Sequence, residues 1–383
     1  MVLAISHRDM KILLLIPSVA KTGIEQEVAA GSHPTMDYYA LAAALSQGNE
    51  TAVETLDYVD VDKEIAPVVR LVRRFAGRDA ALALMGFRRR SEFSALFSNG
   101  ENVGIPLALL LGLLPRRVGH VTIGHRLSSG KKQLFFRVLN AQRRLDKIFV
   151  YAQSQYDWAA DRLHISPEQL ALIPFHADDR FYHALPGPVK SDQICAAGLE
   201  WRDYPTLIAA VEAMPELSVK LAAASPWSKH KDETAERALP ANVEARRYEY
   251  RELRQLYGES SFVVVPLYET DFQAGVTTIL EAMAMGKAVI TTRTTGQTDV
   301  ITDGENGLCV APGDVAGWRE AITRLRSDDA LRLRLGRNAR RWVEEHATLD
   351  QWAMRISAAL RDAAFPVPGR VSDTVSSMKS EQA

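Results

Sequence analysis

One stretch in the second half of the chain combines a buried strand, a polar loop and a helix start, an arrangement suited to binding phosphate. Residues 262–267 form a continuous apolar run rich in β-branched side chains, which is typical of a strand buried in a parallel sheet. A polar loop follows, and then a helix over about 278–285, for which Thr278 and Glu281 have the spacing of a capping box. Because free amides and the positive end of the helix dipole meet at such a helix start, we expect phosphate oxygens to bind here.

This stretch resembles the nucleotide-sugar site of GT-B glycosyltransferases, in particular the retaining family 4. That family has a Glu, seven residues, and then Glu-Ala-Met-Ala-x-Gly-x-Pro-Val-Ile; residues 281–290 here read Glu-Ala-Met-Ala-Met-Gly-Lys-Ala-Val-Ile. Residues 296–308 resemble the Gly-rich segment that follows in the family, with Asp299 where Glu is usual. The first Glu of the pair is replaced by Gln273, and the nearby Glu269 and Asp271 are candidates to supply the missing negative charge.

The resemblance implies an α/β chain of the GT-B class. Two Rossmann-like, doubly wound parallel-sheet domains would face a cleft, and a C-terminal helix would cross back to the first domain. The predicted units are an acceptor domain, a nucleotide-sugar-binding domain, a crossover helix and a disordered tail, at residues 1–185, 186–349, 350–365 and 366–383. The Pro- and Ser-rich composition of the last segment is typical of disorder.

The family's residue roles map onto several positions of the second domain. Glu281 would accept both ribose hydroxyls, with completion of the capping box as the structural alternative. Arg202 takes the place of the Lys that holds the donor diphosphate, in a shortened loop where Leu199 replaces an Arg. The predicted donor-binding residues are Arg202, Tyr248, Gly275, Val276, Thr277, Thr278 and Glu281, with Tyr248 near the nucleobase.

In the first domain, the resemblance points to a His at the end of a strand as a contact to the donor sugar. His125 follows the expected strand 117–123 and is the candidate, with a helix-capping or solvated histidine as the alternative. Loops after parallel strands face the ligand side of the sheet, so the loop 98–102 is expected there as well.

The predicted catalytic residues are His125, Arg202 and Gln273. The predicted acceptor-binding residues are His33, Asn99, Glu101 and Arg126.

The predicted activity is transfer of a hexose from a nucleoside-diphosphate sugar to a glycan, lipid or small-molecule acceptor, with retention of configuration. Two alternatives remain: a donor-binding pseudo-glycosyltransferase subunit, which Gln273 and Leu199 favour, and a nucleotide-sugar epimerase of the same fold. We expect no cofactor beyond the nucleotide-sugar co-substrate. No metal site is expected, because the sequence lacks an Asp-x-Asp near a strand end and a His/Cys cluster at ligand spacing.

Composition places the chain among globular proteins of two ordinary domains. It has 383 residues, of which 47% are apolar and 24% charged. Cys195 and Cys309 are its only cysteines, which favours a reducing cytoplasm over a disulfide framework.

No secretory signal is visible, because the apolar run 12–16 is short and ends at Pro17. The apolar run 105–114 is about half a membrane span and is expected to be a core helix.

The net charge of −1 conceals a strong segregation of charge along the chain. Residues 1–69 hold four basic and ten acidic side chains, a net −6, whereas residues 70–147 hold sixteen basic and four acidic ones, a net +12. One interpretation is a solvated surface balanced by the acidic segment. The other is a basic face that docks peripherally on anionic lipid at the inner membrane face or holds a phosphate-bearing acceptor. Nucleic acid is not expected, because aromatic residues are not interleaved with the basic ones.

Overall fold

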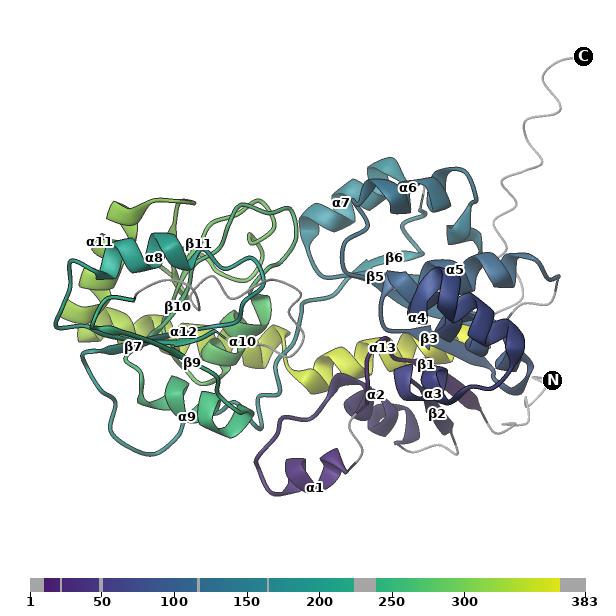
Figure 1. Ribbon diagram of the computed structural model, residues 1–383, viewed down its shortest axis with the longest axis horizontal. Helices are drawn as coiled ribbons and strands as arrows, with labels where there is room; N and C mark the ends of the chain where they lie inside the picture. The colour runs from purple at the N-terminus through teal and green to yellow at the C-terminus, as the bar shows by residue number, and fades with distance from the viewer. Residues whose placement is uncertain are drawn as a thin grey trace, which may run out of the picture.

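The computed structural model describes residues 10–20, 23–47, 51–115, 118–163, 165–223 and 239–365. The chain folds into two domains, each built around a six-stranded sheet in which every paired strand is parallel (Figure 1). This arrangement confirms the predicted GT-B fold class. The predicted tail 366–383 lies outside the described residues.

The first sheet has the strand order β2-β1-β3-β4-β5-β6. Its strands are β1 (Lys11–Leu15), β2 (Ala52–Leu56), β3 (Ala95–Ser98), β4 (Gly119–Gly124), β5 (Lys147–Val150) and β6 (Leu170–Leu172). Its helices are α1 (Ile24–Ala29), α2 (Asp37–Ser46), α3 (Tyr58–Lys63), α4 (Pro67–Arg89), α5 (Glu101–Gly112), α6 (Gly130–Arg137) and α7 (Gln153–Arg162), with short 3-10 turns η1 (Arg90–Glu92) and η2 (Ala141–Arg144). The order in which successive strands join the sheet reverses between β1 and β3, and such sheets bind ligands at this position.

The second sheet has the order β12-β11-β10-β7-β8-β9, with the reversal between β7 and β10. Its strands are β7 (Gln193–Ala197), β8 (Ser218–Ala222), β9 (Val243–Arg246), β10 (Val263–Val265), β11 (Val289–Thr292) and β12 (Leu308–Val310). The helices that follow β7 are α8 (Tyr204–Val211), α9 (Tyr250–Glu259), α10 (Val276–Ala284), α11 (Val315–Ser327), α12 (Asp329–His346) and α13 (Leu349–Ala364).

Strand β10 shows why its sequence is apolar at every position. Val263 and Val265 pack into the core beneath α10 and α12, whereas Val264 packs into the opposite core beneath α8 and α11. Successive side chains of a strand point to opposite faces, so a sheet covered by helices on both sides needs an unbroken apolar run. The apolar sequence is thus the direct cause of the doubly wound arrangement here.

Helix α13 belongs in sequence to the end of the chain but packs on the first domain (Figure 1). Leu349, Trp352 and Ile356 join the core that holds Ile12 and Leu14 of β1. The Arg361 guanidinium also donates to the carbonyls at the end of α2, at 2.9 and 3.1 Å. The predicted return of the C-terminal helix to the first domain is therefore observed.

Local predictions for the first domain were less accurate. Neither helix α1 nor strand β2 was predicted from the sequence. Helix α4 continues to Arg89 beyond a break at Gly77, where φ is 86°. Such a positive φ favours glycine, and it separates α4 into two helical halves.

Candidate active site

Helix α10 begins at the carboxyl end of β10, and its first residues form an open helix terminus. Gly275 is the N-cap, with φ 77°, and no side chain caps this end. The first bond of the helix runs from the Ile279 N–H to the Gly275 carbonyl at 3.1 Å, so the Thr277 and Thr278 amides have no acceptor within the helix. The predicted capping box of Thr278 and Glu281 is wrong, because both side chains lie inside the helix and are buried.

Arg202 fills the space between the ends of β7 and β10. Its side chain is buried, and only 7% of the residue is exposed. Nε donates to the Ala197 carbonyl at 2.8 Å, Nη1 to the Glu200 carbonyl at 2.9 Å and Nη2 to Thr278 Oγ1 at 3.1 Å. Burial lowers the pKa of Arg202, yet a guanidinium keeps its charge at neutral pH. A fixed positive charge therefore lies beside the amino end of α10.

Two glycines make room for this guanidinium. A Cβ on Gly198, which has φ 93°, would lie 2.4 Å from Arg202 Nη2. A Cβ on Gly275 would lie 3.3 Å from Nη1 and 2.9 Å from a methyl of Val265. The loops after β7 and β10 thus close around Arg202, and glycine is required at both positions for steric and conformational reasons.

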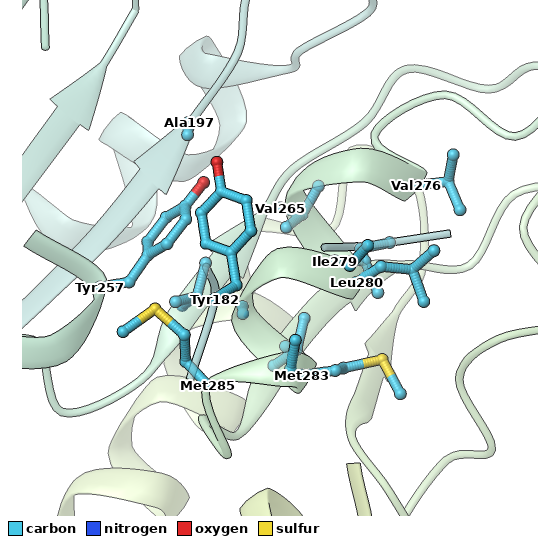
Figure 2. Packing of buried hydrophobic residues seen from close by; sticks show 14 of the residues in the cluster. Tyr182, Ala197, Tyr257, Val265, Val276, Ile279, Leu280, Met283 and Met285 are labelled. Carbon is cyan, nitrogen blue, oxygen red and sulfur yellow. The ribbon is translucent and has the colours of Figure 1, made fainter. Parts of the chain in front are cut away.

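Glu281 lies one turn further along α10 and is 9% exposed. Tyr257 of α9 donates to Glu281 Oε2 at 3.0 Å. The rings of Tyr257 and Tyr182 lie 6.4 Å apart, and both hydroxyls point toward Ala197 at the end of β7 (Figure 2). Burial raises the pKa of Glu281 to about 7, and the two tyrosines and Arg202 act in the opposite direction. A ribose contact requires an accessible carboxylate, and this one is more buried than we expected. Its oxygens can still accept further hydrogen bonds besides the one from Tyr257.

Gln273 lies in the loop before α10. Its Nε2 donates to Asp299 Oδ2 at 3.2 Å, whereas its Oε1 is buried without a hydrogen-bond partner among the described residues. A buried carbonyl oxygen without a donor costs free energy, so it is a ready acceptor for a ligand hydroxyl. The carboxylate nearest to Gln273 in the hydrogen-bond network is that of Asp299, and the loop residues Glu269 and Asp271 bond elsewhere.

His125 follows β4 in the first domain, with an exposed side chain. Its ring lies 5.4 Å from that of Tyr151, centroid to centroid. The carboxylate of Glu101, at the start of α5, accepts the His125 amide at 2.8 Å and the Arg126 amide at 3.3 Å, and it also accepts from the Lys132 ammonium. Burial favours the neutral carboxyl, but the neighbouring His125 and Lys132 outweigh it and lower the pKa of Glu101.

This geometry changes the assignment of Glu101. The residue is buried, and its oxygens hold the backbone of the His125 loop. The prediction that Glu101 contacts an acceptor is therefore replaced by a positioning role, because its carboxylate is already occupied by three donors. Asn99 is similarly engaged, since its Nδ2 donates to Asp37 Oδ2 at 2.8 Å.

The loops that follow the strands of the two domains contact each other directly at Asp271. Its carboxylate accepts from Arg126 Nη2 at 2.8 Å and from Ser128 Oγ at 2.9 Å, both of the first domain. The guanidinium of Arg126 also lies over the Phe272 ring, 5.3 Å from its centroid. A second contact joins the Gln153 amide to Asp299 Oδ2 at 2.9 Å. The loops that carry His125 and Gln273 are thus brought to the same interface.

The remaining predicted residues lie further from Arg202 in the contact network. His33 packs its ring against Tyr250 of α9, with centroids 4.2 Å apart, and so bridges the two domains elsewhere. Tyr248 stacks under the Arg246 guanidinium and lines an open groove of about 710 Å³ beside α9. Sequence reasoning missed Tyr257 and Tyr182, because no local pattern relates either residue to Glu281.

Comparison with known proteins finds a family match within the second domain. Residues 194–328 match the model of the family Glycosyl transferases group 1. A D-inositol 3-phosphate glycosyltransferase of Corynebacterium efficiens is 34% identical over 102 residues, which are 27% of this chain and 22% of that protein. The capsular polysaccharide biosynthesis glycosyltransferase CapM of Staphylococcus aureus is 42% identical over 65 residues, 17% of each chain. The matched segments thus span about a fifth of these relatives.

Structural comparison covers nearly the whole chain. The crystal structure of Anabaena Alr3699/HepE in complex with UDP and glucose superposes with a TM-score of 0.65 at 17% identity. The superposition covers 92% of this chain and 99% of that one. The chain therefore has the GT-B fold of glycosyltransferases, and its second domain contains the segment typical of the Glycosyl transferases group 1 family.

Proposed function

We propose that this protein is a glycosyltransferase that transfers a hexose from a nucleoside-diphosphate sugar to a glycan, lipid or small-molecule acceptor. The observation that carries the proposal is the buried Arg202 guanidinium, held by three hydrogen bonds beside the uncapped amino end of α10. This is an anion site at the strand reversal of a Rossmann-like sheet, where diphosphates bind. The relatives with matching segments are glycosyltransferases, which supports the same assignment.

The chemistry requires stabilisation of the departing diphosphate. Negative charge grows on the phosphate oxygen as the bond to the sugar breaks, and donors fixed in advance stabilise that charge best. Nη1 and Nη2 of Arg202 each carry two hydrogens, and one hydrogen of each is free for a phosphate oxygen. The Thr277 and Thr278 amides supply two further donors. We propose that the acceptor attacks with retention of configuration, with His125 and Gln273 beside the sugar.

Gln273 would act as a neutral contact in place of the family's glutamate. Its Oε1 lacks a partner and can accept a sugar hydroxyl, while its Nε2 stays on Asp299. The Gln273→Glu variant would place a charge beside Asp299 but keep an acceptor at the same position. We therefore expect reduced but measurable turnover. Complete loss of turnover in a folded Gln273→Glu variant would show that the sugar lies elsewhere.

The ribose of the donor is assigned to Glu281. The carboxylate can accept a ribose hydroxyl while it keeps the bond from Tyr257. We expect Glu281→Ala to weaken nucleotide-sugar binding by about 1–3 kcal/mol, the range for a hydrogen bond to a charged group. Isothermal titration calorimetry of the variant and the wild type measures this difference. An unchanged dissociation constant would remove Glu281 from the site.

The direct test is a screen of UDP- and GDP-sugars, with UDP-glucose first because the Anabaena structures contain UDP, glucose or UDP-glucose. Thermal shift identifies the donor, and release of the nucleoside diphosphate on addition of acceptors measures transfer. Turnover that persists with EDTA supports the proposed metal-independent reaction. Tight donor binding without turnover on a broad acceptor panel would indicate a pseudo-glycosyltransferase, and an altered free donor would indicate an epimerase.

A further inference from the structure

The first half of α4 presents large apolar side chains to solvent. Val68, Leu71 and Phe75 are spaced by three and four residues, so they lie on one face of this helix. Leu71 is 56% exposed and Phe75 is 77% exposed, while Val69 of the same half is buried in the core. A single exposed leucine needs no explanation, but an apolar face continued along a helix does.

A groove lies next to this apolar face, since Val72 of the same half of α4 lines it. It has a volume of about 750 Å³ and lies among α4, α5 and the turn η2. Its apolar lining includes Val72 and Leu84 of α4, Leu113 at the end of α5, and Leu139. Leu113 and Leu139 are themselves exposed. Apolar residues from three segments that are distant in sequence, half-buried on α4 and exposed on the other two, thus line one hollow surface.

Basic side chains surround this surface. Arg143 and Arg144 line the groove, and Arg70 and Arg74 alternate with the apolar residues of α4. Within the described part of the chain, Arg70 and Arg74 form no ion pair, whereas Arg73 and Arg78 of the same helix both pair with Asp62 of α3. Asp62 therefore pairs with one arginine of each half of α4, while Arg70 and Arg74 of the first half have no ion-pair partner among the described residues.

We propose that this face, the first half of α4 with the adjoining groove, docks the protein on an anionic lipid bilayer. Phe75 and Leu71 would enter the interfacial region, the arginines would meet lipid phosphates, and the groove would receive part of an acyl chain. Alternating apolar and basic residues on a helix lying on the surface fit this environment. A second copy of the chain is a poorer occupant, because two like-charged basic faces repel each other.

None of the described helices combines the length and apolar character that crossing a bilayer requires, so the proposed contact is peripheral. The proposal does not depend on the identity of the sugar donor, because none of its residues contacts Arg202 or α10. It brings the first domain to a membrane surface and thereby favours lipid-linked acceptors among the classes named above.

The test is co-sedimentation with vesicles made of equal parts phosphatidylglycerol and phosphatidylcholine, compared with pure phosphatidylcholine. We expect the wild type to bind the anionic vesicles and to lose most of this binding in the neutral ones. The double variant Leu71→Ser/Phe75→Ser should bind about tenfold more weakly, since it removes two apolar anchors. Arg70→Gln/Arg74→Gln should weaken binding about fivefold per arginine at low salt and less at high salt.

Leu333→Ser is the matched control, because Leu333 is 59% exposed on α12 of the second domain. This control should bind vesicles as the wild type does. In a Phe75→Trp variant, the emission of the added tryptophan should shift to the blue when anionic vesicles are added. The emission of the tryptophan added by Leu333→Trp should not shift. Since every substituted side chain is exposed, nucleotide-sugar affinity in solution should be unchanged in all these variants, which separates this test from that of the proposed function.

Three results would overturn the proposal. The first is that the wild type does not bind anionic vesicles. The second is that the Leu71→Ser/Phe75→Ser variant binds them as well as the wild type does. The third is that light scattering finds the wild type to be a dimer and this double variant to be a monomer, which would make the face an interface between copies.

Discussion

The loops at the strand ends of the two domains are built on different principles. In the second domain, Arg202 is buried and all of its hydrogen bonds are made to its own domain. In the first domain, His125 and Arg126 are exposed, and the Arg126 side chain reaches Asp271 across the interface. One half of the candidate site is therefore preset before any ligand arrives, whereas the other half depends on how the domains come together.

The energies expected for these two arrangements differ accordingly. Removing one partner of a buried, hydrogen-bonded charge leaves unsatisfied groups behind, which costs several kcal/mol. The Arg126–Asp271 pair has side chains 44% and 42% exposed, so water screens it and its contribution is small. We infer that the second domain fixes the nucleotide of the donor, while contacts of the first domain adjust the sugar and the approach of the acceptor.

The largest expected effect is that of Arg202→Met. This change leaves Ala197, Glu200 and Thr278 without their donor and removes the fixed charge, so the unfolding free energy should fall by about 3 kcal/mol. Chemical denaturation measures the loss, and calorimetry should show greatly weakened donor binding. Arg126→Met is the matched comparison and should change stability by less than about 1 kcal/mol. Equal losses in the two variants would break the contrast between the domains.

The next effect concerns the stability contribution of Glu281 as a function of pH. Burial raises the pKa of Glu281 from 4.5 to about 7, so the folded state binds its proton more tightly than the unfolded state does. The stabilising contribution is full below about pH 4.5 and is lost as the pH rises through about 7. The difference in unfolding free energy between wild type and Glu281→Gln should change by about 3 kcal/mol over this interval. A constant difference would show that Glu281 does not titrate there.

A somewhat smaller effect is expected on donor affinity. If Glu281 accepts ribose hydroxyls as a carboxylate, protonation below its pKa of about 7 weakens binding. Affinity for a nucleotide sugar should fall about tenfold from pH 8 to pH 6, the opposite direction to its effect on stability. Glu281→Gln should bind weakly but without this pH dependence. The same slope in both proteins would assign the titration to another group.

The smallest effect is that of Asp271→Asn. The asparagine keeps an acceptor for Ser128 but loses the ion pair with Arg126, so domain closure should weaken by less than about 1 kcal/mol. Small-angle scattering should show a slightly larger radius of gyration, and raised salt should reproduce the change in the wild type. A large loss of donor affinity would show that donor binding depends on the Arg126–Asp271 ion pair and not mainly on the preset groups of the second domain.

Short-range patterns predicted the second domain well. The buried strand expected at 262–267 is observed as β10, and the string that begins at Glu281 led to the GT-B fold. These features depend on residues close in sequence, so a single chain reveals them. The capping box at Thr278 failed because Gly275, with its positive φ, starts the helix earlier. In the first domain, Glu101 was placed near the site, but its partners lie 24 to 31 residues away.

The sequence by itself determined the apolar strand and the helix around Glu281, because these are local properties, and its resemblance to the GT-B class implied two doubly wound parallel sheets. Only the tertiary structure decided what the charged groups do. It buried Glu281 against Tyr257, wrapped two loops around Arg202 and turned Glu101 toward the His125 loop. The physical reason is that the free energy of a charge depends on its solvation and its partners, and folding brings those partners from distant parts of the chain.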